Sequence, residues 1–196
     1  MKTYTNSWPF NVDYVNNWAF AENVFSKQEC KIIKNLGKNK FETATVVSGK
    51  DGLKVTKKMR ESQVHFIYPS LETDWLYRKM TDLITSVNKD YFKFNLSGLN
   101  EGFQLTLYKK NSFYVKHLDK NFNNKVRKLS LTIQLDDPKT YEGGDLLLHT
   151  QNKPEIMDKK QGTCIFFPSY ILHEVKPVTK GKRYSLVCWV TGPNFK

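Results

Sequence analysis

Short apolar runs follow one another through the second half of the chain, and no other feature of the sequence constrains the fold as strongly. Turn residues separate them, notably Asp-Asp-Pro at 136–138 and Gly-Gly-Asp at 143–145. The runs lie at 102–109, 112–117, 128–135, 145–149, 162–167, 171–176 and 182–191. Many short strands joined by turns are typical of a β-sandwich or jelly roll. This half of the chain is therefore expected to be mainly β.

The helices are expected in the first half. Residues 26–29 read Ser-Lys-Gln-Glu, a capping box that predicts a helix from Ser26 to about Leu36, ended by Gly37. A second helix is expected over 71–92 because apolar residues recur on one face. They are Leu76, Met80, Leu83, Ile84 and Val87. Strands are expected at 41–48 and 60–68, around a polar Gly-Lys-Asp-Gly turn. Helices before many strands predict a jelly roll or sandwich with helices packed on one sheet.

Length and composition favour a single domain, spanning 1–196. A chain of 196 residues fits one domain, and no repeat or linker rich in Pro, Gly or Ser divides it. No apolar run has the length of a membrane span, and the N-terminus lacks the apolar region of a signal peptide. We therefore expect a cytoplasmic protein without a membrane partner. The three cysteines, Cys30, Cys164 and Cys188, are expected to be buried free thiols.

The net charge of +12 favours acidic partners, which include nucleic acid. The lysines are nevertheless scattered, and no motif of a known nucleic-acid-binding module accompanies them. Binding to nucleic acid is therefore a candidate that we do not favour, and a lysine-rich solvated surface is the simpler interpretation.

Two histidines and one aspartate form a candidate metal site. In a strand, His117 and Asp119 point to the same face, although this pair alone is weak evidence. His173 lies in an apolar strand pair, where a polar ring needs a partner. Such a set occupies one face of an octahedral Fe(II) and leaves three positions open, two for a 2-oxo acid and one for dioxygen. Arg183 and Ser185, on one strand face, could then hold the distal carboxylate of that acid.

Seven ordered motifs resemble the prolyl 4-hydroxylase-like branch of the 2-oxoglutarate oxygenases, including its bacterial and phage members. They are QLTLY at 104–108, FYVKHLD at 113–119, RKLSLTIQL at 127–135, YEGGDL at 141–146, GTCIFFP at 162–168, HEVKP at 173–177 and GKRYS at 181–185. The resemblance is strong over about 100–192 and looser over 20–70.

The resemblance implies a fold and a set of site residues. The fold would be a double-stranded β-helix, a cupin-like jelly roll, with its core at about 101–192 and support from about 1–100. His117, Asp119 and His173 match the catalytic metal ligands, and Arg183 matches the residue that binds the distal carboxylate of 2-oxoglutarate. Tyr108, Gln134 and Trp189 fall where relatives place residues of the pocket, although many relatives carry Tyr at the position of Gln134. The implied cofactors are Fe(II), 2-oxoglutarate and O2, with ascorbate as a further candidate.

The resemblance also implies a substrate class, a prolyl residue in a peptide or protein. A small molecule and nucleic acid are the alternatives within the enzyme class, and a metal-binding jelly roll without turnover is the alternative outside it. Oxygenases that dealkylate nucleic acids resemble a pattern with a second arginine six residues after the first, where this chain has Trp189. His65 and His149 are not expected to bind metal. The basic segment at 47–60 resembles a loop that closes over a peptide substrate in related hydroxylases.

Overall fold

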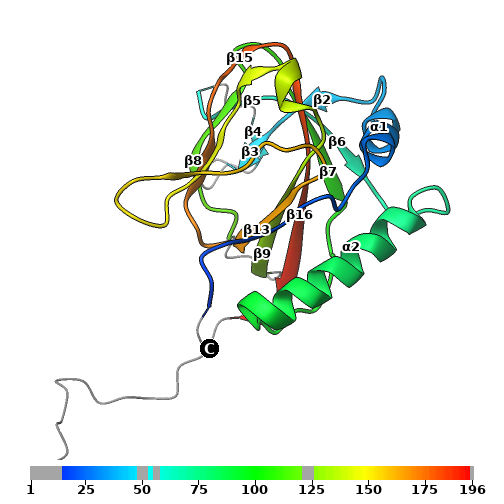
Figure 1. Ribbon diagram of the computed structural model, residues 1–196, viewed down its shortest axis with the longest axis vertical. Helices are drawn as coiled ribbons and strands as arrows, with labels where there is room; N and C mark the ends of the chain where they lie inside the picture. Colours follow the sequence, from blue (N-terminus) through cyan, green and yellow to red (C-terminus); the bar gives the residue numbers. More distant parts are fainter. Residues whose placement is uncertain (1–14, 48–52, 55–57, 121–125, 195–196) are drawn as a thin grey trace, which may run out of the picture.

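Two antiparallel sheets form the body of the protein in a computed structural model, which describes residues 15–47, 53–54, 58–120 and 126–194 (Figure 1). Within this part of the chain the larger sheet has seven strands, in the order β1-β13-β9-β16-β7-β6-β2. Their bounds are Ala19–Ala21 (β1), Cys164–Pro168 (β13), Val126–Gln134 (β9), Arg183–Gly192 (β16), Phe103–Tyr108 (β7), Gln63–Ile67 (β6) and Glu42–Thr43 (β2).

The second sheet has five strands among the described residues, in the order β12-β11-β14-β8-β5. Their bounds are Glu155–Ile156 (β12), Leu146–Leu148 (β11), His173–Val175 (β14), Phe113–His117 (β8) and Arg60–Glu61 (β5). Two small ribbons complete the described strands: β10 (Glu142–Gly143) pairs with β15 (Val178–Lys180), and β3 (Val46–Val47) pairs with β4 (Leu53–Lys54). The expectation of a mainly β jelly roll with helices in the N-terminal half is confirmed.

The first helix, α1 (Lys27–Leu36), begins and ends where the capping box predicts. The side chain of Ser26 accepts a hydrogen bond from the backbone N–H of Glu29, and the carboxylate of Glu29 accepts one from the backbone N–H of Ser26. The second helix, α2 (Asp74–Val87), begins three residues later than predicted and continues as a π-helical turn, Asn88–Phe92. It starts late because the hydroxyl of Thr73 holds a turn, accepting from the N–H of Ser70 and donating to the carbonyl of Tyr68.

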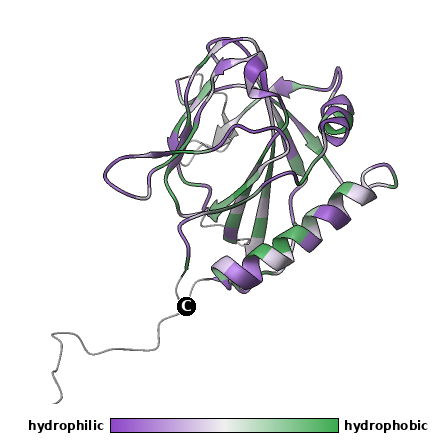
Figure 2. Cartoon of the chain, viewed as in Figure 1, coloured by the Kyte–Doolittle hydropathy of each residue, from purple (hydrophilic) through white to green (hydrophobic). Residues whose placement is uncertain are grey.

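The strands of the larger sheet alternate between two faces, and each face has its own function in the fold. On β9, Leu129, Leu131 and Ile133 belong to the apolar cluster that α2 covers through Leu76, Met80, Ile84 and Val87. Ser130, Thr132 and Gln134 alternate with them, so they point to the opposite face, toward the five-stranded sheet. Figure 2 shows the corresponding hydrophobic segments along these strands.

All three cysteines are buried and unpaired, as the sequence predicts. Cys30, Cys164 and Cys188 pack in the cluster between the helices and the larger sheet. His65 is half-buried on β6, and His149 follows β11 directly, where its Nε2 lies 3.0 Å from a carboxylate oxygen of Glu174. Neither histidine joins the candidate metal site.

The predicted strands at 41–48 and 60–68 are each divided in two. Glu42–Thr43 pairs with β6, whereas Val46–Val47 pairs with Leu53–Lys54. Arg60–Glu61 pairs with β8 in the smaller sheet, and the chain then passes through Ser62 into β6 of the larger sheet. Most of the predicted substrate loop at 47–60 lies outside the described residues. None of the described helices has the length and apolar character that crossing a membrane requires.

Candidate functional site

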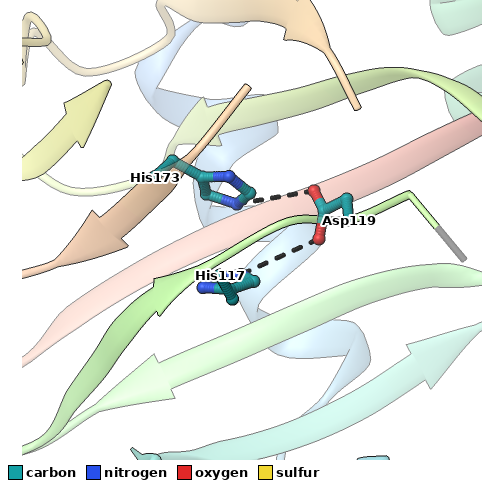
Figure 3. A group of neighbouring side chains, drawn as sticks. All are labelled: His117, Asp119 and His173. Atoms are coloured by element: carbon teal, nitrogen blue, oxygen red, sulfur yellow. Dashed lines mark ion pairs between the residues drawn. The ribbon is translucent and has the colours of Figure 1, made fainter. Parts of the chain in front are cut away.

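His117, Asp119 and His173 come together at the ends of two neighbouring strands of the smaller sheet, as the sequence predicts (Figure 3). His117 ends β8, His173 begins β14, and the two residues are direct partners in the antiparallel register. Their ligand atoms and that of Asp119 all lie within 4.8 Å of one another. The Nε2 atom of His117 is 3.8 Å from Oδ1 of Asp119, and that of His173 is 3.5 Å from Oδ2. No other cluster of three such ligands occurs in the described part of the chain.

Backbone carbonyls orient both imidazole rings. The Nδ1 atom of His117 lies 2.8 Å from the carbonyl oxygen of Val115, and that of His173 lies 2.9 Å from the carbonyl oxygen of Ile171. Because a carbonyl oxygen can only accept, each Nδ1 carries the proton and donates it. The lone pair of each ring is therefore on Nε2, the atom that faces Asp119. Histidines that bind metals are commonly held in this way.

A pair of buried serines orients the carboxylate. The hydroxyl of Ser130 donates to Oδ2 of Asp119 over 2.7 Å, and the hydroxyl of Ser169 lies 2.9 Å from that of Ser130. Since the single proton of Ser130 goes to Asp119, Ser169 donates to Ser130. Both serines are almost completely buried. The chain thus fixes one oxygen of Asp119 with its own hydroxyls.

The electrostatics of His117 and Asp119 favour the forms of these two groups that bind a metal. Burial, with His173 close by, lowers the pKa of His117 to about 4, so the ring is neutral near pH 7. Burial alone would raise the pKa of Asp119, but His173, His117, Arg127 and the Ser130 hydrogen bond together lower it below its usual value. Two imidazoles and a carboxylate with open positions beside them are the donor set that suits Fe(II).

A cavity of ≈ 340 Å³ opens beside the triad, between the two sheets. Its walls include most of the residues predicted for the site: Tyr108, His117, Asp119, His173, Arg183, Ser185 and Trp189. The volume is in the range of a small-molecule site.

Arg183 is the most deeply buried charge in this cavity, with 1% of its surface exposed. Its Nη2 donates to Oε1 of Gln134 over 2.9 Å, and its guanidinium carbon lies 5.3 Å from the ring centre of Tyr108. The Nε and Nη1 atoms are buried, and no described residue accepts from them. A buried donor without an acceptor costs free energy. A ligand carboxylate of 2-oxoglutarate would supply the missing acceptors, so the residues fit that co-substrate.

Gln134 contacts the cavity residue Arg183. It is absent from the cavity wall, and its side chain bridges Arg183 and the backbone carbonyl of Asp158. The reason is its position at the end of β9, where its amide lies beside the guanidinium of the neighbouring strand β16. Gln134 therefore orients Arg183 from behind.

The cavity is also lined by residues that the sequence analysis did not assign to the site, among them Tyr114, Arg60, Arg127 and Glu101. The ring of Tyr114 stacks on that of His117, with centroids 3.5 Å apart and planes 17° from parallel, and Arg60 lies over the other side of the Tyr114 ring, 4.6 Å from its centre. Arg127 lies 3.9 Å from the ring centre of Trp189 and forms two hydrogen bonds with Glu101. These residues are charged or aromatic and lie in or beside the motifs, which was a signal in the sequence. Strand alternation alone did not predict that their side chains face the cavity.

The sequence is similar to a known enzyme family over the same residues. Residues 103–191 match the family model described as 2OG-Fe(II) oxygenase superfamily. A PKHD-type hydroxylase of Prochlorococcus marinus (strain MIT 9515) is 32% identical over 170 residues, which cover 83% of this chain and 73% of that protein. A PKHD-type hydroxylase of Idiomarina loihiensis is 33% identical over 94 residues, 45% of this chain and 43% of that protein. With several of these relatives, the chain aligns over only about half of their length.

Solved structures show the same architecture. A prolyl-4-hydroxylase of Pseudomonas putida has a TM-score of 0.72 at 20% identity, covering 91% of this chain and 94% of that chain. A Trichoplax adhaerens prolyl hydroxylase, in complex with a hypoxia inducible factor peptide fragment, has a TM-score of 0.74 at 19% identity, covering 90% and 84%. At these identities the likeness establishes a shared fold.

Proposed function

The chain belongs to the 2OG-Fe(II) oxygenase superfamily, and from this premise we propose that it is an Fe(II)- and 2-oxoglutarate-dependent dioxygenase that hydroxylates a prolyl residue in a peptide or protein. One observation carries the proposal. The ligand triad and the buried guanidinium of Arg183, whose Nε and Nη1 have no acceptor among the described residues, line the same cavity. A metal-binding module without turnover has no need of a buried cation beside its metal site.

Within this proposal, His117, Asp119 and His173 hold the metal through the two Nε2 atoms and a carboxylate oxygen. The carbonyls of Val115 and Ile171 keep both lone pairs aimed at the site, so little reorganisation is needed on binding. Bound Fe(II) and 2-oxoglutarate would supply the chemistry of hydroxylation, in which O2 oxidises the substrate while 2-oxoglutarate loses CO2 and becomes succinate.

Arg183 binds and orients the co-substrate in this scheme. Its Nε and Nη1 are free to donate to the distal carboxylate, and Ser185, next but one on the same strand, adds a hydroxyl on the same face. Gln134 holds the third nitrogen and fixes the plane of the guanidinium. Tyr108 covers one side of Arg183, and Trp189 contributes an aromatic wall.

The proposal of a prolyl substrate is based on the proteins to which the chain is similar. Its relatives bear the name PKHD-type hydroxylase, and two of the similar structures are prolyl hydroxylases, one of them with a peptide bound. That similarity supports a peptide or protein as the partner of this chain. The three buried free thiols suit a reducing compartment, and we place the reaction in the cytoplasm.

A turnover assay with matched variants tests the proposal. Purified protein with Fe(II), 2-oxoglutarate and a library of proline-containing peptides should form succinate, and mass spectrometry should find an added oxygen on proline. His173→Ala should abolish both signals, whereas His149→Gln, a histidine change outside the cavity, should leave them intact. Failure to form succinate under any condition would favour the binding module. Succinate formation without oxidation of any prolyl peptide would favour a small-molecule substrate.

A further inference from the structure

The charged side chains around the cavity include more positive than negative groups. Three arginines and two carboxylates line it: Arg60, Arg127, Arg183, Glu101 and Asp119. Glu101 is held by Arg127 through two hydrogen bonds. Under the proposed function, on which this inference rests, the charges of Fe(II) and Arg183 offset those of Asp119 and the two carboxylates of 2-oxoglutarate. Arg60 is left as a positive charge without a carboxylate among the described residues.

Arg60 is nearly buried, with 6% of its surface exposed, and it is fixed on three sides. Its backbone pairs with that of Tyr114 in the smaller sheet. Its Nε donates to the hydroxyl of Ser62 over 2.8 Å. Its guanidinium lies 4.6 Å from the ring centre of Tyr114. No described residue accepts from its two terminal nitrogens, which leaves that end of the guanidinium for a ligand.

The contacts of Arg60 do not replace a counter-ion. A tyrosine phenol is neutral near pH 7, and so is the hydroxyl of Ser62. Contact with an aromatic face stabilises a cation by only about 0.5–2 kcal/mol. A cation taken out of water loses far more hydration than that unless an anion accompanies it. An anionic group that enters the cavity therefore gains more from Arg60 than it would from an exposed arginine.

The position of Arg60 relates this charge to the reacting centre. Tyr114 stacks directly on the metal ligand His117, with ring centres 3.5 Å apart, and Arg60 covers the far side of Tyr114. One ring thus separates the guanidinium from a metal ligand. Successive residues of an extended peptide are about 3.8 Å apart at their Cα atoms. Because the side chain of Asp or Glu extends this reach, a residue next to the target can present its carboxylate to Arg60 while the target carbon lies at the metal.

We propose that Arg60 binds a carboxylate of the substrate, so that the favoured substrate carries an acidic group directly beside the prolyl residue that is oxidised. The carboxylate has two sources, the side chain of a neighbouring Asp or Glu or the C-terminal carboxylate of a short peptide. A planar guanidinium with two adjacent donors is the side chain that binds either of them in a fixed orientation.

Peptide binding without turnover separates these sources. The probes are acetyl-Glu-Pro-Ala-amide and acetyl-Ala-Pro-Glu-amide, their Gln counterparts, and acetyl-Ala-Pro with a free C-terminus. Affinities are measured by calorimetry with Mn(II) and 2-oxoglutarate, in the absence of oxygen. Wild-type protein should bind at least one carboxylate peptide about tenfold more tightly than its neutral counterpart, because a charge-assisted hydrogen bond contributes about that much. The peptide with the preference identifies the source and the side of proline on which it lies.

Variants assign the preference to Arg60. Arg60→Gln should abolish it, while Lys110→Gln, which removes the same charge from an exposed residue outside the cavity and outside the segment at 47–60, should retain it. Arg60→Glu should reverse it, so that peptides with Lys in place of Glu bind more tightly. A misfolded variant could not produce such a reversal, and Mn(II) affinity checks each variant independently.

Two sets of results would overturn the inference. One is equal binding of carboxylate and neutral peptides by wild-type protein, including no binding of either at millimolar concentration. The other is an acid preference that survives in Arg60→Gln. The proposed function is judged separately, by oxidation of proline under air. An Arg60-dependent acid preference without oxidation contradicts the prolyl substrate alone, and oxidation without any acid preference contradicts the role of Arg60 alone.

Discussion

The metal end of the cavity and its Arg183 end differ in how far the chain satisfies its own polar groups. At the metal end, both Nδ1 atoms donate to carbonyls, and Ser130 and Ser169 form a chain of hydroxyls to Asp119. At the other end, two of the three nitrogens of the Arg183 guanidinium are buried without an acceptor in the part of the chain that the structure describes. The two ends lie on facing sheets, His117 and His173 on the smaller one and Arg183 on the larger.

The two ends are therefore prepared for their ligands in different ways. The metal end is oriented by the protein before any ligand arrives, which favours tight and geometrically defined binding of the metal. The Arg183 end keeps a buried cation at a cost to stability, and the cost is recovered when a carboxylate binds. Substitutions at the two ends should therefore have different consequences for stability and for binding.

The largest effect is expected from removal of a metal ligand. Asp119→Ala leaves two histidines, which cannot hold the facial geometry, so turnover should fall to background even with added Fe(II). His117→Ala and His173→Ala should behave alike. Succinate formation from 2-oxoglutarate is the measurement. Near wild-type turnover in any of the three variants would remove that residue from the metal site.

The next effect concerns the co-substrate. Arg183→Ala leaves the distal carboxylate of 2-oxoglutarate without its charge partner, a loss of roughly 3–5 kcal/mol, or several orders of magnitude in affinity. Arg183→Lys should recover only part, because a point charge replaces a planar fork. Titration of 2-oxoglutarate in the presence of Mn(II) measures this, and Mn(II) affinity itself should persist. An unchanged affinity for 2-oxoglutarate would place the carboxylate elsewhere.

A smaller effect on metal affinity is expected when the hydroxyls that orient Asp119 are removed but the metal ligands remain. Ser130→Ala frees Oδ2 of Asp119 and should weaken Mn(II) binding by about 10- to 100-fold, as is usual for groups that orient a metal ligand. Ser169→Ala removes only the outer hydroxyl and should weaken binding less. Calorimetric Mn(II) titrations of both variants give the comparison. If Ser169→Ala had the larger effect, the order of the hydroxyl chain would be wrong.

The smallest effect is expected on the stability of the ligand-free protein. Arg183→Met replaces an incompletely bonded guanidinium with an apolar side chain of similar length, so unfolding free energy should stay the same or rise by about 1 kcal/mol. The same variant should lose the added stability that 2-oxoglutarate confers on wild-type protein with Mn(II). Denaturant titrations with and without 2-oxoglutarate measure both quantities. A marked loss of stability without ligand would mean that Arg183 supports the fold.

Strand alternation predicted correctly which side chains share a face at most positions of the site. His117 and Asp119 share a face, and so do Arg183 and Ser185, because successive side chains on a strand point in opposite directions. The same rule separated the apolar residues of β9 from its polar ones. The capping box placed α1 to the residue because its hydrogen bonds are local.

Where the chain departs from regular alternation, the sequence did not predict the orientation of the side chains. β8 has one residue more than β14 between two paired positions, since His117 pairs with His173 but Tyr114 pairs with Val175. This bulge turns Tyr114 onto the face of His117, whereas simple alternation would place it on the other side. The passage of the chain through Ser62 from one sheet to the other likewise sets Arg60 beside Tyr114.

By itself, the sequence determined the strand-rich fold class, and it predicted the candidate metal triad and the candidate arginine for the co-substrate through strand alternation, residue chemistry and the resemblance to the family. Only the tertiary structure decided that Gln134 binds the guanidinium of Arg183, that Ser130 and Ser169 orient Asp119, and that Tyr114 stacks on His117 with Arg60 over the Tyr114 ring. These contacts join strands that are distant in the sequence. They depend on strand register and on a single bulge, neither of which local propensity specifies.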